Sequence, residues 1–255
     1  MSKMFEVDHW FKWRARADVA AAVVLWLAVV TGLYLAFQVF TTRMVALNFI
    51  TFGPVTLFGL GVLIPAVFIV KQGKSMLHIG VTLRYALISI IIGLVLSVFQ
   101  YTFTLANVNL PPMLNLIPLV TMTLTVGLFE AVFFRGFIQL RLEDSFGIIP
   151  GIIVASAMYA LYHIGYGMSW SEMGFLFFLG LIFATIFRIT KNILILWPFF
   201  SPMGSLYTNI QEGLLLPFEA TYGFIIVLVL MLATLAVLAA KTKSHAKNES
   251  RGQTP

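Results

Sequence analysis

The sequence predicts an all-α, polytopic membrane protein of about eight transmembrane helices with both termini in the cytoplasm. Its composition is the first reason: 60% of the 255 residues are apolar, only 10% are charged, and the mean hydropathy is +0.97. Soluble domains are about half apolar and a quarter charged, so a soluble fold is excluded. The second reason is that apolar runs long enough to cross a bilayer alternate with short polar connections. We expect the spans at 19–40, 47–70, 85–106, 113–140, 148–167, 173–189, 192–210 and 221–240.

The third reason is the placement of lysine and arginine. If the N-terminus is cytoplasmic, all 16 of these cations except Arg43 fall in cytoplasmic segments. This positive-inside pattern predicts an even number of spans and a cytoplasmic turn at 144–147. The formal net charge of +6 is therefore explained by membrane orientation, and we expect no nucleic-acid partner. The predicted location is a prokaryotic cell membrane, with the lipid bilayer itself as a partner.

The chain shows no internal repeat and no linker, so we expect a single transmembrane domain over 1–240. Residues 241–255 are polar and basic, and they are expected to form a disordered cytoplasmic tail. Within 192–210, Pro198 and Pro202 predict a kinked or broken helix. The absence of cysteine excludes disulfides, thiolate metal sites and a cysteine nucleophile.

One acidic residue stands apart from the others. Of the 10 acids in the chain, only Glu130 lies inside an apolar span. A carboxylate at membrane depth is costly without a partner, so it indicates a functional site. The candidate partner is His163, the one histidine of 4 that lies inside a hydrophobic helix.

The depths of Glu130 and His163 can be compared if 113–140 and 148–167 form an antiparallel hairpin. Both side chains then lie on the order of 20–25 Å below the turn at 144–147, because a helix rises about 1.5 Å per residue. An acid and an imidazole at one level on adjacent helices have the chemistry to hold and activate a water. The alternatives are a protonated acid that fixes helix packing and a core histidine satisfied by its neighbours. We expect the pair to be reached from the cytoplasmic half of the membrane.

Two more side chains near this pair are candidates. Tyr159 lies one helical turn before His163 on the same face, so its phenol either satisfies or orients the imidazole. Arg135 is either a cation that snorkels to the interface or a clamp for an anionic substrate group, such as a peptide carboxylate. A solvated surface pair, and nothing more, is expected from the nearby charged residues Arg141, Glu143 and Asp144.

The stretch around Glu130 resembles a known motif. Residues 130–136 read EAVFFRG and resemble the EExxxRG motif of the CPBP family, the CAAX-prenyl and bacteriocin-processing (Abi) intramembrane proteases. Residues 159–163 read YALYH and are similar to the family's second motif, FxxxH. The resemblance covers about 115–210 and implies an all-helical fold with a catalytic cavity that opens to the cytoplasm. It also implies that Glu130 and His163 activate a water that attacks a peptide bond of a lipidated or membrane-bound substrate.

Two positions depart from the family pattern. Ala131 stands where the first motif has a second acid, and the third motif, HxxxN, has no histidine, because none occurs between His163 and His245. The equivalent stretch offers polar side chains at helical spacing, namely Ser201, Ser205 and Asn209. Catalytic zinc takes about three protein ligands, whereas the spans supply one histidine and one carboxylate, so zinc is possible but disfavoured and we expect no cofactor.

The leading hypothesis is an intramembrane endopeptidase of this type, with Glu130 as general base and His163 binding the water or the oxyanion. Its expected substrate is a membrane-anchored peptide or protein, including prenylated ones. Substrate-positioning roles are assigned to Arg135, Tyr159, Ser201, Ser205 and Asn209. An alternative is a catalytically silent family member that acts as a membrane scaffold, immunity or regulatory protein, which the missing histidine motivates. A carrier with Glu130 as proton relay is the third hypothesis, and the few polar residues in the spans disfavour it.

Overall fold

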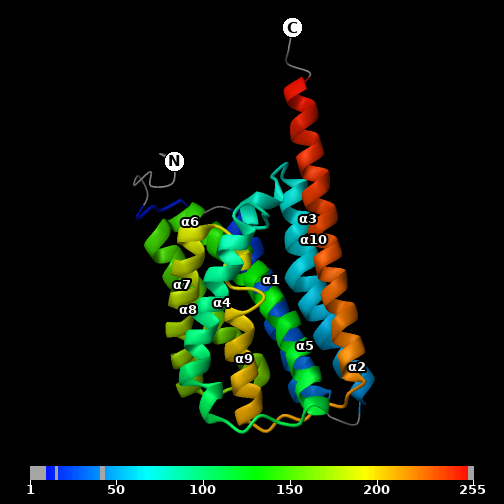
Figure 1. The fold of residues 1–255 in the computed structure, drawn as a ribbon. Coiled ribbons are helices and arrows are strands. Elements are labelled where there is room, and N and C mark those ends of the chain that lie inside the picture. The colour runs from blue at the N-terminus through cyan, green and yellow to red at the C-terminus, as the bar shows by residue number, and fades with distance from the viewer. Residues whose placement is uncertain (1–9, 15–16, 41–43, 252–255) are drawn as a thin grey trace.

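Helices make up all the regular structure in the residues that the computed structural model describes, which are 10–14, 17–40 and 44–251 (Figure 1). Seven helical passages in this part of the chain are long and apolar enough to cross a membrane. They confirm the predicted class, an all-α polytopic membrane protein. The passages are Ala17–Val39, Val45–Lys71, Ala86–Asn107, Met113–Phe146, Ile148–Tyr166, Trp170–Thr190 and Ala220–Thr242.

Several passages combine an α-helix with a wider π-helical or a tighter 3₁₀ stretch. The α-helices are α1 (Ala17–Tyr34), α2 (Val45–Ile50), α3 (Ile64–Lys71), α4 (Ala86–Phe103), α5 (Met113–Glu130), α6 (Leu140–Phe146), α7 (Ile148–Leu161), α8 (Trp170–Thr190), α9 (Phe200–Gln211) and α10 (Ala220–Arg251). The π-helical stretches are η1 (Leu35–Val39), η3 (Thr51–Leu63) and η6 (Ala131–Gln139). The 3₁₀ turns are η4 (Met76–Ile79), η5 (Leu105–Asn107), η7 (Tyr162–Tyr166) and η8 (Ile193–Ile195).

The segment 192–210, which the sequence predicts as an eighth span, is broken into η8 and the 12-residue helix α9. Pro198 explains the break, because proline lacks an amide hydrogen and its ring blocks a continuous helix. At about 1.5 Å per residue, α9 is roughly 18 Å long, too short to cross a hydrocarbon layer about 30 Å thick. The chain between Lys191 and Gln211 nevertheless runs from the α6 end of the bundle to the opposite end (Figure 1).

Helix α1 begins and α10 ends at the same end of the bundle, the end at which α6 lies (Figure 1). This arrangement agrees with the expectation that the chain enters and leaves the bundle on one side of the membrane. The assignment of that side to the cytoplasm of a prokaryotic cell stays a prediction of the sequence.

The tail predicted as disordered from residue 241 is instead helical as far as Arg251, because α10 continues through it. The stretch contains alanine and lysine, which have high intrinsic helix propensity, so the helix extends past the apolar part of α10. Residues 252–255 of the predicted tail lie outside the described residues.

The helix formed by α5, η6 and α6 lies at the core of the bundle, and every residue from Thr125 to Gln139 is buried. Close approach of its neighbours depends on glycine. A Cβ at Gly136 would lie 2.5 Å from the carbonyl oxygen of Ile79, and one at Gly127 would lie 2.7 Å from the Pro202 ring. The two glycines therefore let η4 and α9 press against the central helix.

The prediction that Glu143 belongs to a solvated surface pair is wrong. Glu143 is buried: its Oε1 accepts a hydrogen bond from Gln139 Nε2 at 2.8 Å, and its Oε2 lies 3.2 Å from Lys191 Nζ and 3.5 Å from Arg188 Nε. Burial lowers the pKa of Lys191, and the Glu143 carboxylate opposes that shift. The acid therefore ties α6 to the end of α8.

Arg141 is also buried, whereas Asp144 is exposed. The Arg141 guanidinium donates to the Phe137 carbonyl oxygen at 2.8 Å, and its carbon atom lies 3.8 Å from the centroid of the Phe137 ring. The N-terminal segment closes over this turn, because the Lys12 and Arg14 amides each donate at 2.9 Å to the carbonyl oxygens of Phe146 and Ser145. Sequence spacing does not predict that the N-terminal segment covers this turn. The cover buries residues that were expected at the surface.

We predict that Glu143→Gln lowers the free energy of unfolding by about 1–3 kcal/mol, because it leaves two half-buried cations without their carboxylate. Chemical unfolding in detergent micelles measures the effect. Glu219→Gln, at an exposed acid beyond the opposite end of the bundle, is the matched control and should be neutral. Equal stability of the two variants would show that the Glu143 contacts contribute nothing.

Candidate active site

Glu130 lies where α5 passes into η6, roughly half-way along the helix Met113–Phe146, and it is buried. Its two carboxyl oxygens have different partners. Oε1 accepts a hydrogen bond from the Tyr162 phenol, and Oε2 accepts one from the Ser201 hydroxyl at 2.9 Å. The acid therefore joins three elements, α5, η7 and α9.

The π-helical stretch η6 begins directly after Glu130. Such wide turns are often found at functional sites, because they re-aim the side chains that follow them. Phe129, Phe133 and Phe137 repeat every fourth residue and stack along one face, with ring centroids 5.5 and 6.2 Å apart. The carboxyl is thus surrounded by aromatic surface on the side that leads to α6.

The His163 ring is oriented by its own helix. Its Nδ1 lies 3.0 Å from the Tyr159 carbonyl oxygen and 3.3 Å from that of Ala160. Carbonyl oxygens only accept, so Nδ1 carries the proton and a neutral ring offers Nε2 as an acceptor. The backbone of Tyr159, and not the phenol that the sequence suggests, is the hydrogen-bonding partner, while the Tyr159 ring packs edge-on against the imidazole at 5.4 Å.

Glu130 and His163 make no direct hydrogen bond with each other in the described part of the chain, but Tyr162 contacts both. Its phenol donates to Glu130, and its ring centroid is 4.1 Å from that of His163. Tyr162 is fully buried and is absent from the residues that the sequence singles out. The sequence offers one signal for Tyr162, a phenol next to the histidine in an apolar helix. Because adjacent residues point about 100° apart on a helix, this signal did not place the phenol at the site. A water shared by the acid and the imidazole stays a prediction.

Arg135 does not snorkel to an interface, because it is only 2% exposed. Its guanidinium carbon lies 4.9 Å from the centroid of the Tyr159 ring, a cation–π contact. Both terminal nitrogens are buried, and neither has a hydrogen-bond partner among the described residues. A guanidinium with two free nitrogens in a fork has the geometry to bind a carboxylate.

The three candidates for the degenerate third motif separate in the structure. Ser201 is buried and contacts Glu130, whereas Ser205 and Asn209 are half-buried and lie one and two turns further along α9. The Asn209 amide donates to the Ser205 carbonyl oxygen at 2.7 Å and makes a weaker contact with the Ser205 hydroxyl at 3.4 Å. Of these three side chains, Ser201 is therefore the one held against the acid.

The described residues around Glu130 do not form a cluster typical of a metal site, and the absence of a cofactor stays a prediction. In the described ranges, no three histidine, cysteine, aspartate or glutamate side chains come together as a possible metal site. Zinc in catalytic sites has about three protein ligands of these types, and here the immediate partners of the carboxyl are two hydroxyls.

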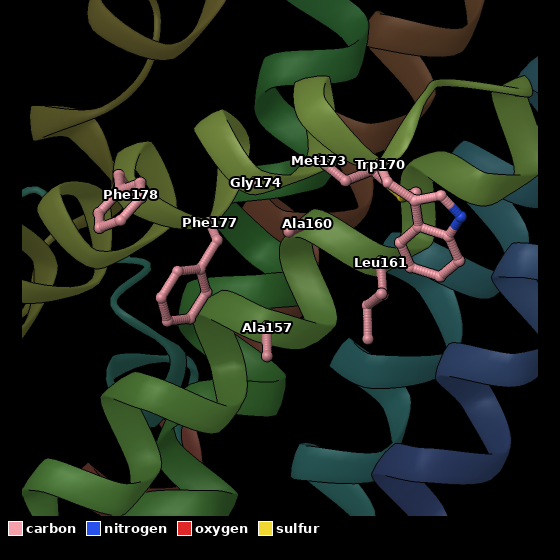
Figure 2. Close-up of a pocket in the computed structure, with 8 residues that line it drawn as sticks. All are labelled: Ala157, Ala160, Leu161, Trp170, Met173, Gly174, Phe177 and Phe178. Carbon is pink, nitrogen blue, oxygen red and sulfur yellow. The ribbon is translucent and has the colours of Figure 1, made fainter.

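An apolar groove lies beside the His163 segment, between α7 and α8, with a volume of about 330 Å³ (Figure 2). Its walls include Ala157, Ala160 and Leu161 from α7 and the rings of Trp170, Phe177 and Phe178 from α8. The groove and the site share a wall, because the Ala160 carbonyl also contacts His163 Nδ1.

Fold and site together define a class: a polytopic helical membrane protein with a carboxylate buried at the centre of its core helix. Comparison with protein families makes the class specific, because residues 112–200 match the model described as type II CAAX prenyl endopeptidase Rce1-like. The match supports the resemblance to the CPBP family of membrane proteases that the two motifs predict. A search of curated proteins found no match to the chain, and a search of solved structures found none.

We predict that Tyr162→Phe lowers the free energy of unfolding by about 1–3 kcal/mol, because it removes a donor from a buried carboxyl. In a Glu130→Leu background the same change should cost much less, since no carboxyl is left to satisfy. Chemical unfolding of the four proteins of this double-mutant cycle measures the coupling. Tyr222→Phe, at a phenol that is 61% exposed, is the control. Additive effects would mean that the Tyr162–Glu130 contact does not stabilise the protein.

Proposed function

We propose that the protein is an intramembrane endopeptidase that hydrolyses a peptide bond of a membrane-anchored substrate, including prenylated peptides. The observation that carries the proposal is the buried Glu130 carboxyl, one aromatic ring away from an oriented His163, inside the segment that matches the CAAX endopeptidase family. A buried acid near an imidazole has the chemistry for general-base hydrolysis.

In the proposed reaction, Glu130 takes a proton from a water whose oxygen attacks the scissile carbonyl carbon. In this reaction, Nε2 of His163 holds the water or the developing oxyanion. Collapse of the tetrahedral intermediate breaks the C–N bond, and Glu130 returns the proton to the amine. Tyr162 and Ser201 hold the carboxyl in position through its two oxygens.

Arg135 supplies a second element of the proposal. Its two terminal nitrogens, which have no hydrogen-bond partner among the residues that the structure describes, suit a substrate carboxylate, and the C-terminus of a short peptide is such a group. The cation–π contact with Tyr159 holds the guanidinium in position to bind the substrate carboxylate. The apolar groove between α7 and α8 has the chemistry to hold an isoprenoid chain beside the site.

We predict that Glu130→Gln lowers kcat for cleavage of a prenylated CAAX reporter peptide by about 10²-fold or more, because an amide cannot accept the proton of the water. Product formation in proteoliposomes, followed by mass spectrometry, measures the effect. Glu219→Gln is the control for loss of a carboxylate elsewhere. Cleavage that survives Glu130→Gln would remove the acid from the mechanism, and cleavage that is lost with a chelator would contradict a metal-free one.

A catalytically silent membrane protein is the second candidate, and one observation favours it. Ser201 contacts Glu130 in the stretch where the family resemblance implies a histidine, so both carboxyl oxygens are already occupied by hydroxyl donors. If these hydroxyls close the site, water has no place beside the acid.

The variant Ser201→His separates the two candidates. For an active protease, it should lower kcat, because a bulky ring replaces the small donor that holds Glu130. For a silent protein, it should create cleavage of the reporter peptide that the wild type lacks. The measurement is the same peptide assay, with Ser171→His, at an exposed serine near the start of α8, as the control for added imidazole.

A further inference from the structure

Residues 10–14, the N-terminal strap, lie against the turn between α6 and α7. Besides the two strap amides that donate to the last turn of α6, the Ile149 amide in the first turn of α7 donates to the Trp10 carbonyl oxygen at 3.3 Å. The Trp13 ring adds a side-chain contact, with its centroid 5.2 Å from that of Phe146. The last carbonyls and the first amides of a helix have no partner within that helix. The strap therefore satisfies backbone groups at the ends of two helices.

The side chains of the strap, in contrast, remain largely uncovered. Trp10, Phe11 and Trp13 are 51%, 70% and 88% exposed. Arg14 is exposed, and Lys12 is half-buried. Neighbouring aromatic side chains left in water are unfavourable, and an exposed apolar patch with polar residues beside it marks a site of interaction. The strap is thus attached through its backbone and presents its side chains to another partner.

The position of the strap indicates that this partner is the membrane surface. The strap lies beside α6 at one end of the bundle (Figure 1). Helix α1, which opens a passage long and apolar enough to cross a membrane, begins at Ala17, shortly after the strap. The strap is therefore at the level where a spanning helix leaves the hydrocarbon and meets the lipid headgroups. Tryptophan is enriched at this level, because its ring is amphipathic.

The charges on and around the strap favour anionic headgroups. The strap carries two cations, Lys12 and Arg14. Of the acids in this part of the structure, Asp144 is exposed, Asp18 accepts a hydrogen bond from a glutamine at 3.0 Å, and Glu143 is paired with two cations at the end of α8. Anionic lipid attracts lysine and arginine that lie near the membrane surface. The two cations of the strap thus complement a negatively charged lipid layer.

We propose that the N-terminal strap is a binding surface for the headgroup layer of anionic phospholipids, and that this layer holds the strap on the α6–α7 turn. The backbone hydrogen bonds fix the rings and the cations next to one another, so the docked strap binds the layer without first having to be ordered. A ligand that binds one of two states better shifts the equilibrium toward that state. The lipid composition therefore sets how firmly the end of α6 is covered. The inference concerns the membrane surface and does not depend on peptide cleavage.

Hydrogen–deuterium exchange of the full chain in lipid nanodiscs tests the proposal. The amides of Lys12, Arg14 and Ile149 are protected while the strap is docked, so their exchange rate measures docking. One set of nanodiscs holds phosphatidylcholine alone, and the other holds phosphatidylglycerol as well. We expect exchange about tenfold slower in the anionic nanodiscs, because the two cations then contribute to docking. Fragments from the buried η6 report whether each variant is folded.

The double variant Lys12→Gln with Arg14→Gln removes the charge of the strap and keeps its backbone donors. In this variant, the two kinds of nanodisc should give the same exchange rate. The matched control is Lys71→Gln with Lys74→Gln, which removes two cations at the same end of the bundle, at and after the end of α3 (Figure 1). The control should keep the lipid dependence of the wild type.

Phe11→Ser tests the contribution of the aromatic rings. The ring is 70% exposed, so its loss should speed exchange of the strap amides about tenfold in both kinds of nanodisc, because it no longer enters the headgroup layer. Trp170→Ser, at a ring that is 74% exposed at the start of α8, is the control and should leave this exchange unchanged.

Equal exchange of the wild type in the two kinds of nanodisc would overturn the proposal. A lipid dependence that survives Lys12→Gln with Arg14→Gln would also overturn it. The same holds if Lys71→Gln with Lys74→Gln abolishes the dependence equally, because charge anywhere at this end would then be sufficient. Exchange in Phe11→Ser at the rate of the wild type would show that the rings of the strap do not lie in the lipid surface.

Discussion

The contact of one buried carboxyl with two hydroxyls from other parts of the chain is the constraint on which the site depends. An isolated carboxyl in an apolar interior is costly, and each hydroxyl offsets part of that cost. Tyr162 is 32 residues from Glu130 in the sequence and Ser201 is 71 residues away, so the acid is satisfied only when three passages of the bundle come together. Folding of the core and assembly of the site are therefore one event.

The break in the passage between α8 and α10 helps to supply the Glu130 carboxyl with a hydroxyl partner. Pro198 stops a continuous helix, and α9 begins two residues later, which places Ser201 in its first turn. Pro202 then fits against Gly127, where any side chain would collide with the ring. The interruption that removes a span from the bundle thus brings a hydroxyl to the acid.

Three residues of the two motifs lie inside the segment that matches the CAAX endopeptidase model. The segment 112–200 keeps the first acid, the arginine and the histidine of the two motifs, at Glu130, Arg135 and His163. Hydroxyls supply the contacts to the acid, and the guanidinium rests on a Tyr159 ring with two nitrogens that have no hydrogen-bond partner in the described part of the chain. Oxygen donors hold a carboxyl without carrying charge, so they preserve its position while changing what else can bind beside it.

The sequence by itself determined the membrane class and the helical passages except 192–210, and it singled out Glu130, Arg135 and His163 as candidates, because these follow from hydropathy and from local motifs. It also indicated the break at Pro198, since proline acts on its own backbone. Only the tertiary structure decided that Tyr162 contacts both the acid and the imidazole and that Ser201 bonds to Glu130. It likewise decided that Glu143 and Arg141 are interior, because an N-terminal segment covers their turn. The physical reason is common to all of these: burial and pairing depend on which distant segments meet, and no local pattern in the chain encodes that meeting.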